Sequence, residues 1–207
     1  MTLTNERYEE IKRIVVEVFK KYKISCVPVS GFELAVKLGI KIIPYSNFSE
    51  RKQILMLKKS EDGFCVEKNV GEWFIFYNDS RPYPRINNTF MHEIGHIILD
   101  HSEDSELAEA EVKFFAKYAL APPVLIHKFQ LKNPEQVADV FEISYTAARY
   151  AYTYYQKWLA FGPTEFTDYE IELLNLFEAA GKGGGPIERN NKNTFVSCWR
   201  SRQMCFH

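Results

Sequence analysis

The sequence has few cysteines, no long apolar run and no excess of charge of one sign. Its four cysteines among 207 residues, Cys26, Cys65, Cys198 and Cys205, form no Cys-x-x-Cys pair, so we expect reduced thiols rather than a disulfide framework. No stretch approaches the roughly 20 apolar residues of a membrane span, and the first residues show no apolar signal region. The net charge of −1 gives no electrostatic footprint for nucleic acid or an anionic membrane. We therefore expect a cytoplasmic protein that has no membrane partner.

The hydrophobic fraction of 46% is ordinary for a globular protein that can bury a core. The motif that carries chemistry is His-Glu-Ile-Gly-His, residues 92–96. On a helix, two imidazoles four residues apart share one face and can bind one metal ion, usually zinc. Glu93 between them can take a proton from a metal-bound water. The alternative is a pair of surface histidines that match the motif by chance.

The helical register supports the metal site. At about 100° per residue, an apolar stripe lies opposite His92 and His96, so the two rings face away from the core that the stripe would join. The stripe consists of Phe90, Ile94, Ile97 and Ile98.

A catalytic zinc needs a third protein ligand and an open position. Asp100 is excluded, because it lies about 12 Å along the helix axis from His92 at 1.5 Å per residue. In the next expected helix, residues 105–120, Glu111 lies in the middle of an apolar face, whereas Glu109 lies on the polar side with Lys113. A carboxylate on a buried face is costly unless it is paired or bound to a metal. This favours Glu111 as the ligand over Glu109, and the alternative is a buried Glu111 paired with Arg or Lys.

These residues resemble the ImmA/IrrE family of metallopeptidases. The resemblance rests on residues 92–96, on Glu111-Val-Lys-Phe-Phe-Ala116 and on Leu120-Ala-Pro122. It implies that His92, His96 and Glu111 are the metal ligands and Glu93 the catalytic base. The family usually has Ala-Asn at 112–113 and Met at 121, so the departures touch packing rather than the ligands.

The expected fold class is α+β, with a small, mostly antiparallel sheet packed on a helical body and a zincin-like His-Glu-x-x-His helix beside a third-ligand helix. Amphipathic helices are predicted at residues 6–22 and 30–38. Strands are predicted at 41–45, 53–57 and 72–77, with a fourth candidate at 64–66 and a hairpin turn at Glu61-Asp-Gly63. Residues 73–78 are the candidate edge strand for holding an extended substrate, and a plain scaffold strand is the equal alternative.

Residues 134–160 resemble a helix-turn-helix, which raises DNA binding as a second function class. The details disfavour it, because Glu142 occupies the turn position that favours Gly. The second helix offers many tyrosines but only Arg149 and Lys157 as cations, and phosphate contacts need Lys or Arg. These residues argue against direct nucleic-acid binding and favour a helical pair that packs on the zinc helices.

Residues 1–181 are predicted to form the zinc metallopeptidase domain, including the helical pair at 134–160, and residues 182–207 a Gly-rich linker and tail. Cys198, Cys205 and His207 match no standard zinc module, which favours a loosely docked or poorly ordered tail over a metal knuckle.

The predicted function is zinc-dependent, site-specific peptide hydrolysis, although Mn²⁺ or Fe²⁺ could occupy the same ligands. His101, Tyr118 or one of the other tyrosines could stabilise the oxyanion, and no spacing selects among them. The family resemblance implies a protein partner, a helix-turn-helix repressor cut in a mobile element or a stress response. The alternatives are a regulator that binds metal and a repressor without cutting, and a DNA-binding module.

Overall fold

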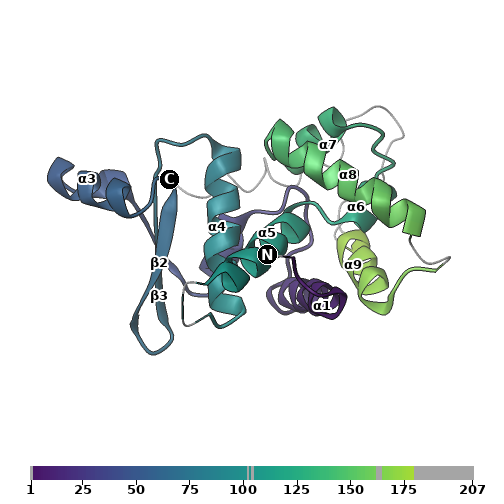
Figure 1. Cartoon of the computed structure of the whole chain (residues 1–207), viewed down its shortest axis with the longest axis horizontal. Helices are drawn as coiled ribbons and strands as arrows, with labels where there is room; N and C mark the ends of the chain where they lie inside the picture. Colours follow the sequence, from purple (N-terminus) through teal and green to yellow (C-terminus); the bar gives the residue numbers. More distant parts are fainter. Residues whose placement is uncertain (1, 102, 104, 162–164, 180–207) are drawn as a thin grey trace. The chain divides into compact units, whose positions relative to one another are not determined.

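The computed structural model describes residues 2–101, 103, 105–161 and 165–179, and these form two compact units. The first unit comprises Met1–Val15 and Ser30–Leu120, and the second comprises Val16–Val29 and the chain from Ala121 onward. Helix α1 (Asn5–Tyr22) contributes its first part to one unit and its last part to the other (Figure 1).

The first unit contains a three-stranded mixed sheet in the order β1-β3-β2. Strand β1 (Lys41–Pro44) runs parallel to β3 (Glu72–Tyr77), and β2 (Gly63–Asn69) runs antiparallel to β3. A tight turn at Gly71, where φ is +77°, joins β2 to β3, and this left-handed backbone favours glycine. The central strand is the most buried, and Ile75 on it has no solvent exposure.

Four further helices belong to this unit: α2 (Gly31–Lys37), α3 (Glu50–Lys59), α4 (Tyr83–Ile98) and α5 (Glu106–Leu120), with a short 3-10 turn, η1 (Tyr45–Asn47), before α3. Helix α4 packs against β2, β3, α2 and α5, and so connects the sheet to the rest of the unit (Figure 1). The side-chain oxygen of Asn87 on α4 accepts a hydrogen bond at 2.6 Å from the backbone N–H of Gly31, and this bond fixes the start of α2 on α4.

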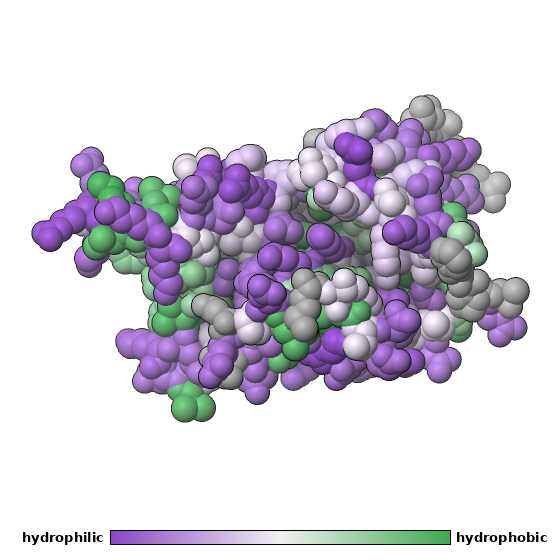
Figure 2. Space-filling model, viewed as in Figure 1, coloured by the Kyte–Doolittle hydropathy of each residue, from purple (hydrophilic) through white to green (hydrophobic). Residues whose placement is uncertain are grey.

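Residues 53–57 were predicted as a strand, and this prediction is wrong, because they form the middle of α3. A short apolar run does not by itself distinguish a strand from a helix. Here the helix has no buried residue, so its apolar side chains lie at the surface, among hydrophilic ones in Figure 2. The exposed large ones are Ile54, Leu55 and Leu57.

The predictions for the sheet are partly correct. The strands at 41–45 and 72–77 and the candidate at 64–66 are present with small shifts of their ends. The hairpin turn was placed at residues 61–63, but the turn of the β2–β3 hairpin follows Asn69. Residues 73–78 are not an edge, because β3 is paired on both sides and the edge strands of this sheet are β1 and β2.

The second unit is helical in its described part and contains α6 (Pro123–Lys128), α7 (Pro134–Phe141), α8 (Tyr145–Phe161) and α9 (Asp168–Ala179). The Asn133 side chain caps α7 by accepting from the N–H of Gln136 at 2.9 Å. Glu142, between α7 and α8, has a φ of +49°, so the turn position that favours Gly does adopt the left-handed conformation. Its core includes the fully buried side chains of Phe19, Leu125, Phe141 and Leu173.

The predicted α+β class is confirmed, with one parallel and one antiparallel strand pair. The predicted boundary at residue 181 and the tail with Cys198, Cys205 and His207 lie outside the described residues. Among the helices that the structure describes, none has both the length and the hydropathy to cross a membrane.

Candidate metal centre

Helices α4 and α5 approach each other closely at Gly95. A Cβ atom at this position would lie 3.2 Å from Cδ1 of Phe115 and 3.3 Å from Cβ of Val112, both on α5. Phe90 and Ile94 of the predicted apolar stripe are buried, whereas Ile97 and Ile98 are of intermediate burial. Met91, which is not part of the predicted stripe, is also buried. The absence of a side chain at Gly95 therefore lets the helix that carries the two histidines approach α5.

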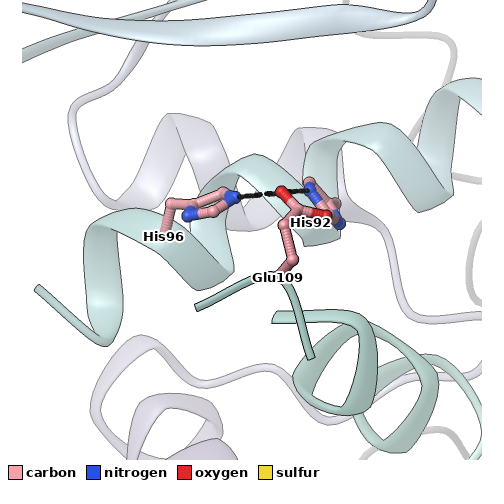
Figure 3. A group of neighbouring side chains, drawn as sticks. All are labelled: His92, His96 and Glu109. Atoms are coloured by element: carbon pink, nitrogen blue, oxygen red, sulfur yellow. Dashed lines mark hydrogen bonds and ion pairs between the residues drawn. The ribbon is translucent and has the colours of Figure 1, made fainter. Parts of the chain in front are cut away.

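The histidine pair is brought together with a carboxylate from α5. His92 and His96 lie one turn apart on α4, and their Nε2 atoms are 3.3 Å apart. The Oε1 atom of Glu109 lies 3.5 Å from Nε2 of His92 and 3.4 Å from Nε2 of His96. Figure 3 shows the two rings and the carboxylate pointing toward one another from the two helices. Within the described residues, this is the group of His, Cys, Asp and Glu side chains whose geometry could hold a metal ion.

The sequence favours Glu111 over Glu109 as the third ligand, whereas in the structure Glu109 is the carboxylate that lies beside the two histidines. Glu111 is 5% exposed, as expected, but its carboxylate is held by Arg7 of α1, whose Nε and Nη2 donate to it at 2.8 and 2.6 Å. Nε2 of His101 lies 2.9 Å from the same carboxylate. The buried carboxylate thus pairs with an arginine, which is the alternative that the sequence left open for Glu111. Arg7 itself was missed, because no spacing in the sequence connects α1 to α5.

Burial favours the neutral form of His92, and the neighbouring cations favour the ionised form of Glu109. Burial lowers the pKa of His92, and the neighbouring His96 lowers it further, against the opposing effect of Glu109. Burial raises the pKa of Glu109, but a hydrogen bond from Lys113 and the nearby histidines outweigh it, so the pKa is lowered overall. Neutral imidazole and carboxylate are the forms that bind metal ions.

Glu93 lies on α4 between the two histidines and is 8% exposed. Its Oε2 accepts a hydrogen bond at 2.9 Å from the backbone N–H of Cys65 on β2. Because β2 pairs with β3 on its other side, this N–H points outward from the open side of the sheet. The carboxylate is therefore oriented by the strand edge that lies beside α4.

The separations among the three ligand atoms fit a tetrahedral cation. Zinc binds imidazole nitrogen and carboxylate oxygen at about 2.0–2.2 Å, and two tetrahedral bonds of that length end about 3.3–3.6 Å apart. The three separations observed are 3.3, 3.4 and 3.5 Å. Three donors of the N, N, O type, with a fourth position left over, match the composition of a catalytic rather than a structural site.

Comparison with protein families matches residues 37–153 to the IrrE N-terminal-like domain, Peptidase M78. This segment contains β1, β2, β3, α4 and α5, and it covers more than half of the chain. The chain belongs to this family. No curated protein matches it.

Membership of the peptidase family confirms the resemblance found in the sequence and implies a metal cofactor and a protein substrate. One residue that contacts a carboxylate near the site lies outside the matched segment. Arg7, which binds the carboxylate of Glu111, precedes the segment by 30 residues, since the segment begins at residue 37.

Proposed function

We propose that this protein is a zinc-dependent, site-specific endopeptidase in which His92, His96 and Glu109 bind the metal and Glu93 is the catalytic base. The observation that carries the proposal is the convergence of three donor atoms at separations of 3.3–3.5 Å. Glu109 replaces Glu111 as the third ligand, because Glu111 is occupied by Arg7 and His101.

The residues of the chain have distinct tasks in this reaction. A bound divalent cation would supply a Lewis acid that acidifies water and polarises the scissile carbonyl. Glu93 accepts the proton of the attacking water and passes it to the leaving amine. The N–H of Cys65, by holding one oxygen of Glu93, fixes the direction in which the carboxylate works.

The open edge of β2 is the surface that we propose for the substrate backbone. An extended peptide can add to an exposed sheet edge through main-chain hydrogen bonds. This edge carries the N–H that contacts Glu93, whereas β3, the strand favoured by the sequence, is paired on both sides. The substrate that we propose is a helix-turn-helix repressor, and the family resemblance is what supports this choice.

The test is Glu93→Gln, which retains the shape of the side chain and removes the base. We expect metal and partner binding to be kept, and cleavage of a candidate repressor to fall by about 10²–10⁴-fold, the usual contribution of general-base catalysis. Glu50→Gln, at an exposed position of α3, is the matched control, and a chelator is added in a parallel reaction.

Undiminished cleavage by Glu93→Gln would show that Glu93 is not the base. Stable partner binding without any cleavage by the wild-type protein, with zinc bound, would support the alternative of a regulator that cuts nothing.

A further inference from the structure

A second cluster of charged and ring side chains lies behind the candidate metal ligands. It consists of Arg7, Glu111 and His101, whose side chains are 27%, 7% and 12% exposed. The cluster contacts the ligands at His96, where Nδ1 of His101 lies 3.3 Å from Nδ1 of His96. The Nε2 atom of His96 is the one that faces His92 and Glu109.

The end of α4 explains why His101 lies beside His96. Leu99 caps the helix, and Asp100 follows with a φ of +55°. The backbone N–H of His101 then donates to the carbonyl of His96 at 3.1 Å, five residues earlier. This is the hydrogen bond of a Schellman turn, which reverses the chain at a helix C-terminus. The ring of His101 is thereby placed beside the last turn of α4.

The charged pair of Arg7 and Glu111 determines which ring nitrogens of His101 and His96 carry a hydrogen. Arg7 donates to both oxygens of Glu111, at 2.8 and 2.6 Å, and a carboxylate in such a two-pronged pair with a guanidinium is ionised and can only accept. His101 must therefore carry its hydrogen on Nε2, and in the neutral ring its Nδ1 is an acceptor. An acceptor at 3.3 Å favours a hydrogen on Nδ1 of His96, which leaves the lone pair of that ring on Nε2.

We propose that His101 is a positioning residue that holds His96 in the tautomer and orientation required of a metal ligand, and that Glu111 and Arg7 hold His101. This inference rests on the proposed metal site of His92, His96 and Glu109. It assigns a task to Glu111, which is not itself in the ligand group, and to α1, which lies outside the family-matched segment. Partners of this kind typically contribute 10- to 100-fold to metal affinity.

The experiment measures zinc affinity by competition with a chromophoric chelator, together with the thermal stability of the metal-free protein. For His101→Phe, which removes both ring nitrogens, we expect an affinity about 10- to 100-fold weaker. His101→Gln keeps one acceptor and one donor, so we expect it to restore part of the affinity. His127→Phe is the matched control, because His127 is exposed and belongs to the other unit.

A direct readout of the tautomer is available in the ¹⁵N-labelled, zinc-loaded protein. In the wild type, the Nδ1–H of His96 should give an imidazole proton signal that exchanges slowly with water. In His101→Phe this proton should exchange rapidly, or its signal should be lost. If His101→Phe does not fold, Arg7→Met, which loosens Glu111, provides the test, with Arg13→Met at an exposed position of α1 as its control. We expect Arg7→Met to weaken zinc binding and Arg13→Met to leave it unchanged.

Two different failures can be told apart. If Glu109→Ala and His92→Ala leave zinc binding intact, the proposed metal site is wrong. If those variants lose zinc but His101→Phe and Arg7→Met bind it within twofold of wild type and only melt earlier, the cluster is a structural ion pair and this inference is overturned.

Discussion

The exchange of roles between Glu109 and Glu111 gives the most decisive prediction, because the two residues differ in what their removal should damage. Glu109→Ala removes a carboxylate that contacts two histidines and Lys113 at a half-exposed position. Glu111→Ala removes a buried carboxylate that pairs with Arg7 and His101. The first should affect metal binding, and the second chiefly the stability of the fold.

The magnitudes can be estimated separately. Structural zinc sites with four ligands bind with about 10–16 kcal/mol, so one ligand carries about 2.5–4 kcal/mol, and its loss weakens binding by about 60- to 1,000-fold. Glu109→Ala should cost little stability in the metal-free protein, because pairs at half-exposed positions contribute only about 0–1 kcal/mol. Removing one member of a buried ion pair costs about 3–5 kcal/mol, and the 27% exposure of Arg7 places Glu111→Ala at the lower end, about 3 kcal/mol.

Two measurements on each variant test this prediction: zinc affinity by chelator competition, and urea unfolding of the metal-free protein. Glu109→Ala should lose affinity and keep stability. Glu111→Ala should lose stability, with the smaller loss of affinity expected from a residue behind the ligands. A metal-free Glu111→Ala protein that is as stable as wild type but binds no zinc, together with a Glu109→Ala protein that binds zinc normally, would refute the reasoning and restore Glu111 as the ligand.

Two other predictions concern stability. Glu111 has a lowered pKa because Arg7 donates hydrogen bonds to it, so its stabilisation is complete above the ordinary value of 4.5 and is lost as the pH falls through the lower folded value. We therefore expect the difference in unfolding free energy between wild type and Glu111→Gln to shrink below about pH 4.5. Urea unfolding with a chelator present measures this difference. A difference that stays constant down to about pH 3 would contradict the prediction. Gly63→Ala should destabilise the protein by about 1–3 kcal/mol or more. The reason is that a Cβ at this position would lie 2.7 Å from Cγ2 of Thr89 and 2.8 Å from the carbonyl oxygen of Phe76. Chemical denaturation measures the loss of stability, and an unchanged midpoint would disprove the close packing.

The placement of the histidine pair on one face of a helix could be predicted from the sequence, because it depends on one helix alone. The spacing of four residues and the apolar stripe of α4 are local properties, and helical geometry converts them directly into positions in space. The Schellman turn that returns His101 to His96 is also local, but no signal for it was used: Asp100 occupies the left-handed position, where glycine is the usual residue.

The third ligand could not be predicted in the same way, because it depends on how two helices cross. Val112 and Phe115 mark the face of α5 that meets α4 at Gly95. At about 100° per residue, Glu109 lies about 90° to one side of that face and Glu111 about 70° to the other. Both carboxylates therefore flank the contact, and the direction in which α5 crosses α4 decides which of them meets the histidines.

The strand predicted at residues 53–57 failed for a related reason. A buried element there would show the alternation of a strand or the apolar stripe of a packed helix. In α3 the apolar residues are exposed instead, and the helix is set by local interactions, such as the bond at 2.7 Å from the Gln53 side chain to the carbonyl of Phe48. A surface helix of this kind has no core-facing pattern that could be recognised in the sequence.

Burial was the criterion that selected Glu111 in the sequence, and the contacts of Glu111 give a reason to prefer a less buried carboxylate as the proposed ligand. A fully buried carboxylate must be neutralised by the protein itself, and Arg7 does this for Glu111. A metal ion that keeps an open position for water and substrate has to lie where these can enter, so its ligands belong at the border between core and solvent. The side chains of His92, His96 and Glu109 are 21%, 13% and 39% exposed, against 7% for Glu111. Intermediate burial next to a His-Glu-x-x-His helix is therefore the criterion that we infer for a ligand, and on α5 it selects Glu109, the ligand of our proposal.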